Sequence, residues 1–157
     1  MSDDISILLD AYRNGPAMLR NALEKADPSH FDLTPVPGKW SIRQVVCHIS
    51  DFEPVYADRF KRVLVEDNPT IFGGDPDAYA AALAYGNRSV ERELAYIEAT
   101  REHMLPILQQ CDIEHYQRTG VHSEDGPMTL ETLINRIVAH IPHHVKFIEE
   151  KLAALNA

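Results

Sequence analysis

Four long stretches of this chain place apolar residues at the three- and four-residue spacing of an amphipathic α-helix, and this feature limits its fold more than any other. The first covers residues 3–26, the second begins at Ser41 and runs through Val63, the third opens at Asp75 and reaches Gln110, and the fourth follows Thr129. Strand patterns with a period of two residues are essentially absent. The predicted architecture is therefore all-α, a four-helix bundle with connections longer than the minimum.

Cap and turn residues indicate where these helices begin and bend. Ser41 has the spacing of a capping box, and Asp75-Pro76 gives an N-cap followed by proline at the first helical position. Gly15-Pro16 is expected to kink or restart the first helix, and Gly86-Asn87 to divide the third. The polar connection over residues 115–127 is predicted to form a short hairpin or an irregular lid.

Composition excludes several classes of protein. At 157 residues the chain has the length of one domain, residues 1–157, and its formal net charge of −9 argues against nucleic-acid binding. The N-terminal stretch lacks the basic start and continuous apolar core of a signal peptide, and no apolar run approaches the ~20 residues that span a bilayer. Cys47 and Cys111 belong to no paired motif, which favours a reducing compartment. We therefore expect a cytoplasmic protein that binds neither nucleic acid nor a membrane.

Three histidines point to a metal site. His140 and His144 are one turn apart, and a rotation of about 100° per residue places both within roughly 60° of Ile137 on the apolar face of their helix. His48 lies inside the apolar arc of the second helix in the same way. Three neutral imidazoles leave a coordination position open, as in catalytic metal sites. The alternative is that each is a core histidine hydrogen-bonded to a carbonyl or carboxylate.

Residues beside these positions are secondary candidates. Asp51 and Glu53 either orient a metal-bound histidine or act as a general base, or else they belong to the solvated edge of the helix. His122, on the polar connection, is expected to overhang the site. Tyr56 and Arg59 line a substrate pocket or lie at an interface or rim.

The remaining histidines, and the cysteine next to His48, are expected to play no part in the site. Cys47 points about 100° away from His48, and His143 falls about 120° from the apolar face, toward solvent. His30, His103 and His115 have no companion at ligand spacing. Pro142 either bends the last helix so that His144 is aimed across the bundle, or is simply tolerated there.

Two ordered sets of motifs carry a family resemblance. They are Pro37-Gly38-Lys39-Trp40-Ser41 leading into His48-Ile49-Ser50-Asp51, and Gly126-Pro127-Met128-Thr129-Leu130 with His140-Ile141-Pro142-His143-His144. In this order they resemble the DinB-like superfamily of damage-inducible and thiol-dependent bacterial proteins, which includes the YfiT-type metal-binding proteins. The resemblance implies a four-helix bundle, often a homodimer, that holds one divalent metal ion, zinc or nickel, on three histidines. Carried onto this sequence, those ligands are His48, His140 and His144. A proline between the paired ligands, here Pro142, is not general in the superfamily.

A metal ion on three neutral imidazoles keeps most of its charge and lowers the pKa of a bound water or thiol. The leading hypothesis is a metal-dependent enzyme that transfers a low-molecular-weight thiol to a small electrophile. The thiol comes only from the resemblance, since characterised relatives use bacillithiol, mycothiol or glutathione. The alternatives are a metal-dependent hydrolase that uses a metal-bound hydroxide, and a metal-binding stress protein without enzymatic activity. The expected partner is a small-molecule substrate.

Overall fold

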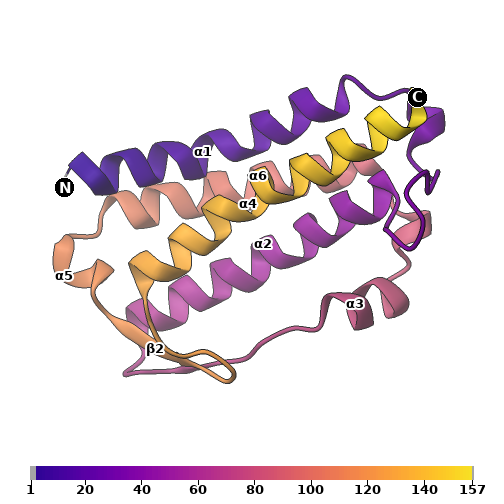
Figure 1. Cartoon of the computed structure of the whole chain (residues 1–157). Helices are drawn as coiled ribbons and strands as arrows, with labels where there is room; N and C mark the ends of the chain where they lie inside the picture. Colours follow the sequence, from indigo (N-terminus) through magenta and orange to yellow (C-terminus); the bar gives the residue numbers. More distant parts are fainter. Residues whose placement is uncertain (1–2, 157) are drawn as a thin grey trace.

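Four long helices form the body of the protein in a computed structural model that describes residues 3–156. They are α1 (Asp3–Leu23), α2 (Ile42–Val65), α4 (Val90–Gln109) and α6 (Leu130–Leu155). Figure 1 shows α1 and α6 running in one direction and α2 and α4 in the other. α1 packs mainly on α4 and α6, and α2 packs on the same two helices, so the consecutive helices α1 and α2 lie diagonally across the bundle. The predicted four-helix bundle is confirmed.

Short elements fill the connections. They are η1 (Pro28–His30), β1 (Thr70–Ile71), α3 (Pro76–Ala82), η2 (Tyr85–Asn87), α5 (Ile113–Tyr116), β2 (Thr119–His122) and β3 (Gly126–Thr129). The connection from α2 to α4 returns along the length of the bundle and carries β1 and α3 (Figure 1). As a result α2 and α4 run parallel, whereas consecutive long helices joined by a short loop would run antiparallel.

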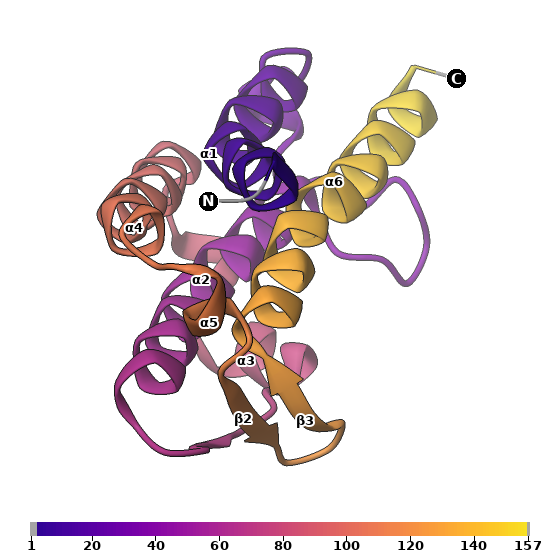
Figure 2. The ribbon, with the colours of Figure 1, turned by 90° about the vertical axis from the view of Figure 1, so that its left-hand side faces the viewer.

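A small sheet lies at one end of the bundle, on the side of α2 and α6 (Figure 2). β2 pairs antiparallel with β3, with Thr119 opposite Thr129, and β1 pairs parallel with β2, with Thr70 opposite Val121. Of the two structures predicted for residues 115–127, the hairpin is the correct one. The sequence shows no period-two pattern for this sheet, because strands of two to four residues are too short to produce one.

The helix starts follow the capping residues. Ser41 forms the predicted capping box, Asp75 accepts hydrogen bonds from the first turn of α3, and Thr129 caps α6. η2 divides the third helical segment at Gly86-Asn87, as expected. The restart expected at Gly15-Pro16 does not occur, because α1 is one continuous helix through both residues. Within residues 3–156, no helix combines the length and the apolar character needed to cross a membrane.

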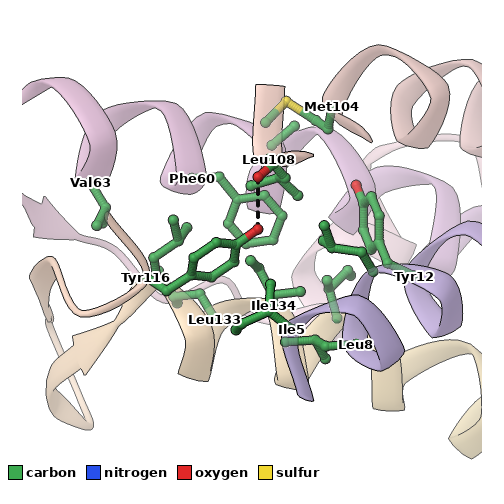
Figure 3. Packing of buried hydrophobic residues seen from close by; sticks show 14 of the residues in the cluster. Ile5, Leu8, Tyr12, Phe60, Val63, Met104, Leu108, Tyr116, Leu133 and Ile134 are labelled. Carbon is green, nitrogen blue, oxygen red and sulfur yellow. Dashed lines mark hydrogen bonds between the residues drawn. The ribbon is translucent and has the colours of Figure 1, made fainter. Parts of the chain in front are cut away.

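Two clusters of buried apolar side chains form the core. One gathers at the end of the bundle nearer the sheet, where Figure 3 shows Tyr116 packed against Phe60 and Leu133 with its hydroxyl donating a hydrogen bond to the Leu108 carbonyl oxygen, 2.7 Å away. The other includes Ile49 and Ile141. Along each long helix the two clusters occupy separate stretches.

A buried ion pair joins α2 to α4 at the level where one apolar cluster ends and the other begins. Arg101 and Glu53 are 1% and 0% exposed, and the Arg101 guanidinium donates to both carboxylate oxygens at 2.6 and 2.9 Å. Arg101 also donates to the Tyr12 carbonyl oxygen, which Pro16 cannot bond because proline has no N–H. Gly15 makes room for this contact, since a Cβ there would stand 2.2 Å from Arg101 Nη1. The sequence places Gly15-Pro16 at the point where an arginine crosses the bundle.

Candidate metal centre

The start of α2 determines where His48 lies along the bundle, opposite the two candidate histidines of α6. The Ser41 hydroxyl accepts a hydrogen bond from the Gln44 N–H at 3.2 Å, and the Gln44 side chain accepts one from the Ser41 N–H at 2.8 Å. This reciprocal cap fixes the first turn of α2, and His48 follows about two turns further along. His140 and His144 lie on α6, which runs antiparallel to α2 and packs against it (Figure 1).

The Nε2 atoms of these histidines converge. The Nε2 atom of His140 lies 2.9 Å from that of His48 and 3.1 Å from that of His144. All three ligand atoms lie within 4.8 Å of one another, and in the described chain no second group of three His, Cys, Asp or Glu residues comes together in this way. The structure therefore brings together the three residues predicted as metal ligands. Metal binding itself stays a prediction.

The other ring nitrogens of the cluster have no partner. Nδ1 of His48, of His140 and of His144 is buried and forms no hydrogen bond with any residue of the described chain. The pKa is lowered to about 4 for His48, to about 2 for His140 and to about 3 for His144. Burial is the main cause in each case, neighbouring histidines contribute in the same direction, and Asp51 partly opposes the shift of His48. All three rings are therefore neutral at neutral pH, which is the form that binds a metal.

A divalent metal ion fits this arrangement. Bonds of about 2.0–2.1 Å at tetrahedral angles separate imidazole nitrogens by roughly 3.3 Å, close to the 2.9 and 3.1 Å that separate Nε2 of His140 from Nε2 of His48 and of His144. Protons alone satisfy the cluster poorly, because each neutral imidazole carries one N–H to share among three converging Nε2 atoms and three isolated Nδ1 atoms. Hydrogen bonds to carbonyls or carboxylates, the alternative reading of these histidines, do not occur at Nδ1 in residues 3–156.

Aromatic rings and a cavity surround the cluster. The ring centroids of Trp40 and Phe52 lie 5.2 and 4.8 Å from that of His48, and the centroid of Phe147 lies 5.6 Å from that of His144. His144 also lines a cavity of about 220 Å³. The polar and aromatic side chains that share this cavity are Lys39, Trp40, Asp77, Phe147 and Lys151. A small molecule in the cavity would therefore lie directly against one of the three histidines.

The two carboxylates predicted near His48 have other partners. Asp51 forms an ion pair with Arg88 at 2.8 Å, and Glu53 forms the buried pair with Arg101. Of the alternatives open for Asp51, the one in which it orients the His48 ring does not occur in this structure, because Nδ1 of His48 has no partner. Glu53 is fully buried, so the alternative of a solvated edge is wrong for it, and its two oxygens are held by Arg101. Neither carboxylate is available as a general base at the cluster.

The remaining secondary candidates lie elsewhere. Nδ1 of His122 accepts hydrogen bonds from the N–H groups of Glu124 and Asp125, both at 3.3 Å. His122 therefore orders the turn between β2 and β3, and it belongs neither to the histidine cluster nor to the residues that line the cavity beside His144. The Arg59 guanidinium stacks 4.7 Å from the Tyr56 ring centroid, and neither residue lines the cavity beside His144.

Cys47 and His143 stand outside the cluster of three histidines. Cys47 is fully buried, its Sγ lies 3.6 Å from the Tyr85 carbonyl oxygen, and burial raises its pKa to about 11. It is a packed thiol, as predicted. His143 is exposed beside its buried neighbour His144. Pro142 lies inside a continuous α6 and does not end it.

Sequence reasoning missed two buried cations, Arg101 and Lys151. Both had a detectable signal. Arg101 follows Ile97 by four residues, and Lys151 follows His144 by seven, so each lies on the inward face of its helix. Helical position alone would have marked them as charges that need a partner.

Comparisons with known proteins agree with this fold and cluster. The model of the DinB superfamily matches residues 11–148. A protein of Oceanobacillus iheyensis, provisionally named a metal-dependent hydrolase, is 28% identical over 133 residues, which cover 85% of this chain and 77% of that relative. A Bacillus cereus protein with the same provisional name is 29% identical over 141 residues, covering 90% of this chain and 81% of the relative.

A solved structure is similar over almost the whole chain. It is that of YfiT from Bacillus subtilis, described as a probable metal-dependent hydrolase with an unusual four-helix bundle topology. The TM-score is 0.90 at 25% sequence identity, and the match covers 99% of this chain and 90% of YfiT. This chain and YfiT therefore have the same overall fold.

Proposed function

The chain belongs to the DinB superfamily, and from that premise we propose that it is a metal-dependent hydrolase of small molecules, with one divalent metal ion, zinc or nickel, held by His48, His140 and His144. The observation that carries the proposal is the convergence of three Nε2 atoms from rings whose Nδ1 atoms are buried and have no hydrogen-bond partner in the described chain. Hydrolysis was the alternative hypothesis from sequence. The names of the relatives favour it over thiol transfer, which the comparisons do not support.

The bound metal would act as a Lewis acid and lower the pKa of a water molecule toward neutrality. The protein supplies the surroundings. Trp40, Phe52 and Phe147 pack around the three imidazoles and limit the access of bulk water. The substrate would lie in the cavity that His144 lines, and so next to the His144 side of the cluster.

Hydrolysis also needs a group that accepts a proton from the attacking water. Asp51 and Glu53 are engaged in ion pairs, whereas Asp77, in the first turn of α3, lines the cavity together with His144. We propose that the Asp77 carboxylate accepts this proton. No other Asp or Glu of the described residues lines the cavity.

The first experiment measures the metal in untagged protein purified without chelators. We expect about one equivalent of zinc or nickel per chain, lost in His144→Ala and retained in His143→Ala, the exposed neighbour on the same helix. Unchanged metal content in His144→Ala with the fold intact would refute the ligand assignment. Protein that takes up no metal, even after soaking with zinc and nickel, would leave a bundle with buried histidines.

The second experiment measures turnover of a panel of ester and amide probes without any thiol. We expect hydrolysis that a chelator abolishes, and Asp77→Asn is expected to lower kcat at unchanged metal content by about 10²–10⁴-fold, the usual contribution of a general base. Conjugation of chlorodinitrobenzene that requires an added thiol, with no hydrolysis, would instead establish the thiol-transfer hypothesis. Stoichiometric metal with neither activity would favour a metal-binding protein without catalysis.

A further inference from the structure

The cavity beside His144 contains two ammonium groups, in a protein whose net charge is −9. Lys39 and Lys151 both line it, and Asp77 is the single carboxylate among its described lining residues. The charged side chains of the cavity therefore sum to one positive charge. The net charge of the cavity lining is therefore positive, whereas that of the whole protein is negative.

Lys151 is the more unusual of the two. It is 2% exposed, and no carboxylate of residues 3–156 lies within 4.0 Å of its Nζ atom. Its ammonium group donates to the Phe147 carbonyl oxygen at 3.2 Å and lies 5.8 Å from the centroid of the Phe147 ring. The hydrogen bond satisfies one of its three N–H donors, and no carboxylate is in direct contact with the ammonium group. A buried cation of this kind is costly unless a ligand supplies the anion.

The electrostatics of the cavity agree with this geometry. Burial lowers the pKa of the Lys151 ammonium, and the nearby charge of Lys39 lowers it further, while Glu150 acts in the opposite direction. Lys39 and Lys151 thus repel each other across the cavity. An anion placed between them would relieve both the burial and the repulsion.

Local backbone geometry holds Lys39 and Trp40 in the cavity wall. Gly38 has a positive φ of 73°, a conformation that favours glycine, and the chain enters the α2 cap at Ser41 directly afterwards. The connection before α2 therefore presents Lys39 and Trp40 opposite Phe147 and Lys151 on α6. Two aromatic rings form apolar walls, and two ammonium groups provide the charge.

We propose that this cavity binds the anionic end of the substrate, a small molecule with a carboxylate or phosphate group on an apolar body, with Lys151 and Lys39 as the counter-charges. The substrate class rests on the proposed hydrolase function, since the reacting bond must then lie toward His144. The cavity of about 220 Å³ limits the molecule to a small one.

The test uses metal-free protein, so that an anion cannot bind through a metal ion. Trp40 is the single tryptophan of the chain and lines the cavity, so its fluorescence reports binding there. The protein is titrated with benzoate and with benzamide, which has nearly the same shape without the charge. We expect saturable quenching by benzoate, and binding of benzamide at least about tenfold weaker. Equal affinities for the two probes, or no saturable binding of benzoate, would overturn the proposal.

Matched variants assign the charge. Lys151→Met keeps most of the side-chain volume and is expected to weaken benzoate binding about tenfold, with no change for benzamide. Lys39→Met is expected to weaken it less, since Lys39 is exposed. Lys146→Met, an exposed lysine of the same helix, is the control and should bind benzoate as the wild type does. Wild-type affinity in both Lys151→Met and Lys39→Met would contradict the assignment.

Further measurements separate the possible outcomes. Phenyl phosphate in place of benzoate shows which anion the cavity prefers, and tighter binding of either over benzamide supports the counter-charges. If Lys151→Met does not fold, Lys39→Met, at an exposed position, carries the test alone. Anion binding by metal-free protein does not depend on metal content or turnover. Failure of the hydrolase proposal would therefore appear in the metal and ester assays and leave the probe titration as an independent result.

Discussion

Two clusters of buried polar side chains lie in the same bundle, and they differ in how completely they are paired. Arg101 makes four hydrogen bonds, two to Glu53 and two to the carbonyl oxygens of Tyr12 and Ile137. The three histidines contact only one another through Nε2, and their Nδ1 atoms have no partner in the described chain. The same interior thus holds one cluster that is satisfied by the protein and one that is not.

This difference distinguishes structure from binding. Buried polar groups are almost always hydrogen-bonded in folded proteins, so a fully bonded ion pair requires no ligand to explain it. The unpaired ring nitrogens, together with the ammonium of Lys151, which has no carboxylate in contact with it, favour a ligand. We therefore expect substitutions in the first cluster to change stability, and substitutions in the second to change binding.

The largest expected effect tests the ion pair. Glu53→Leu leaves the Arg101 charge buried and uncompensated, which costs about 3–5 kcal/mol in the free energy of unfolding. Urea denaturation of metal-free protein measures this loss. The double variant Glu53→Leu/Arg101→Met should recover part of the stability, because it removes both charges. Recovery stays partial, since Arg101→Met also deprives the Tyr12 carbonyl oxygen of its donor.

The control for this prediction is Asp10→Leu, which breaks the exposed pair of Asp10 with Arg13. An exposed ion pair contributes at most about 1 kcal/mol. Similar losses in Glu53→Leu and Asp10→Leu would remove the distinction between the buried cluster and an ordinary surface pair.

The next effect tests the space made for Arg101. Gly15→Ala places a Cβ 2.2 Å from Arg101 Nη1, so it must displace the guanidinium. We expect a loss of about 1–3 kcal/mol, the usual cost of overpacking, although alanine favours a helix over glycine by about 1 kcal/mol. Gly86→Ala is the control, because no atom lies within 4 Å of its added Cβ. A Gly15→Ala variant more stable than the wild type would show that Arg101 moves at no cost.

The histidine cluster should show the opposite balance. His140→Leu removes a buried Nδ1 atom that has no partner, but it also takes away the contact that His48 and His144 make through Nε2. These two effects oppose each other, so the metal-free variant should differ from the wild type by no more than about 1–3 kcal/mol. At the same time it should lose its metal. Elemental analysis and urea denaturation of the same samples measure both quantities, with His143→Leu as the exposed control. A loss of stability in metal-free His140→Leu that exceeds that of Glu53→Leu would show that the histidines are structural.

The sequence predicted what depends on local spacing. The four helices, the caps at Ser41, Asp75 and Thr129, and the inward positions of the three histidines all follow from residues a few positions apart. The ion pair could not be predicted in this way. Glu53 and Arg101 are 48 positions apart, and their contact depends on how α2 and α4 are aligned in space.

The errors have the same physical origin. Asp51 lies three positions after His48 and seemed placed to hold its ring, but Arg88 from the connection before α4 takes the carboxylate instead. Glu53 seemed to lie on the solvated edge, because its partner on α4 is invisible in the sequence around it. The hairpin of β2 and β3 was one of the two structures predicted for its segment, but the parallel pairing of β1 with β2 was not predicted, since it joins residues about fifty positions apart. In each case a long-range partner decided the outcome.

The smallest expected effect tests whether the histidine cluster has any support from Asp51. A carboxylate that orients a metal ligand usually contributes 10–100-fold to metal affinity. Because Asp51 is bonded to Arg88 and Nδ1 of His48 has no partner, Asp51→Asn should change zinc affinity by no more than about threefold, the residual effect of a nearby charge. Competition with a chromogenic chelator measures this, and His48→Ala, which removes a ligand, gives the upper limit. A loss of tenfold or more in Asp51→Asn would mean that the carboxylate leaves Arg88 for His48 when metal binds, and the two kinds of buried cluster would then be linked through α2.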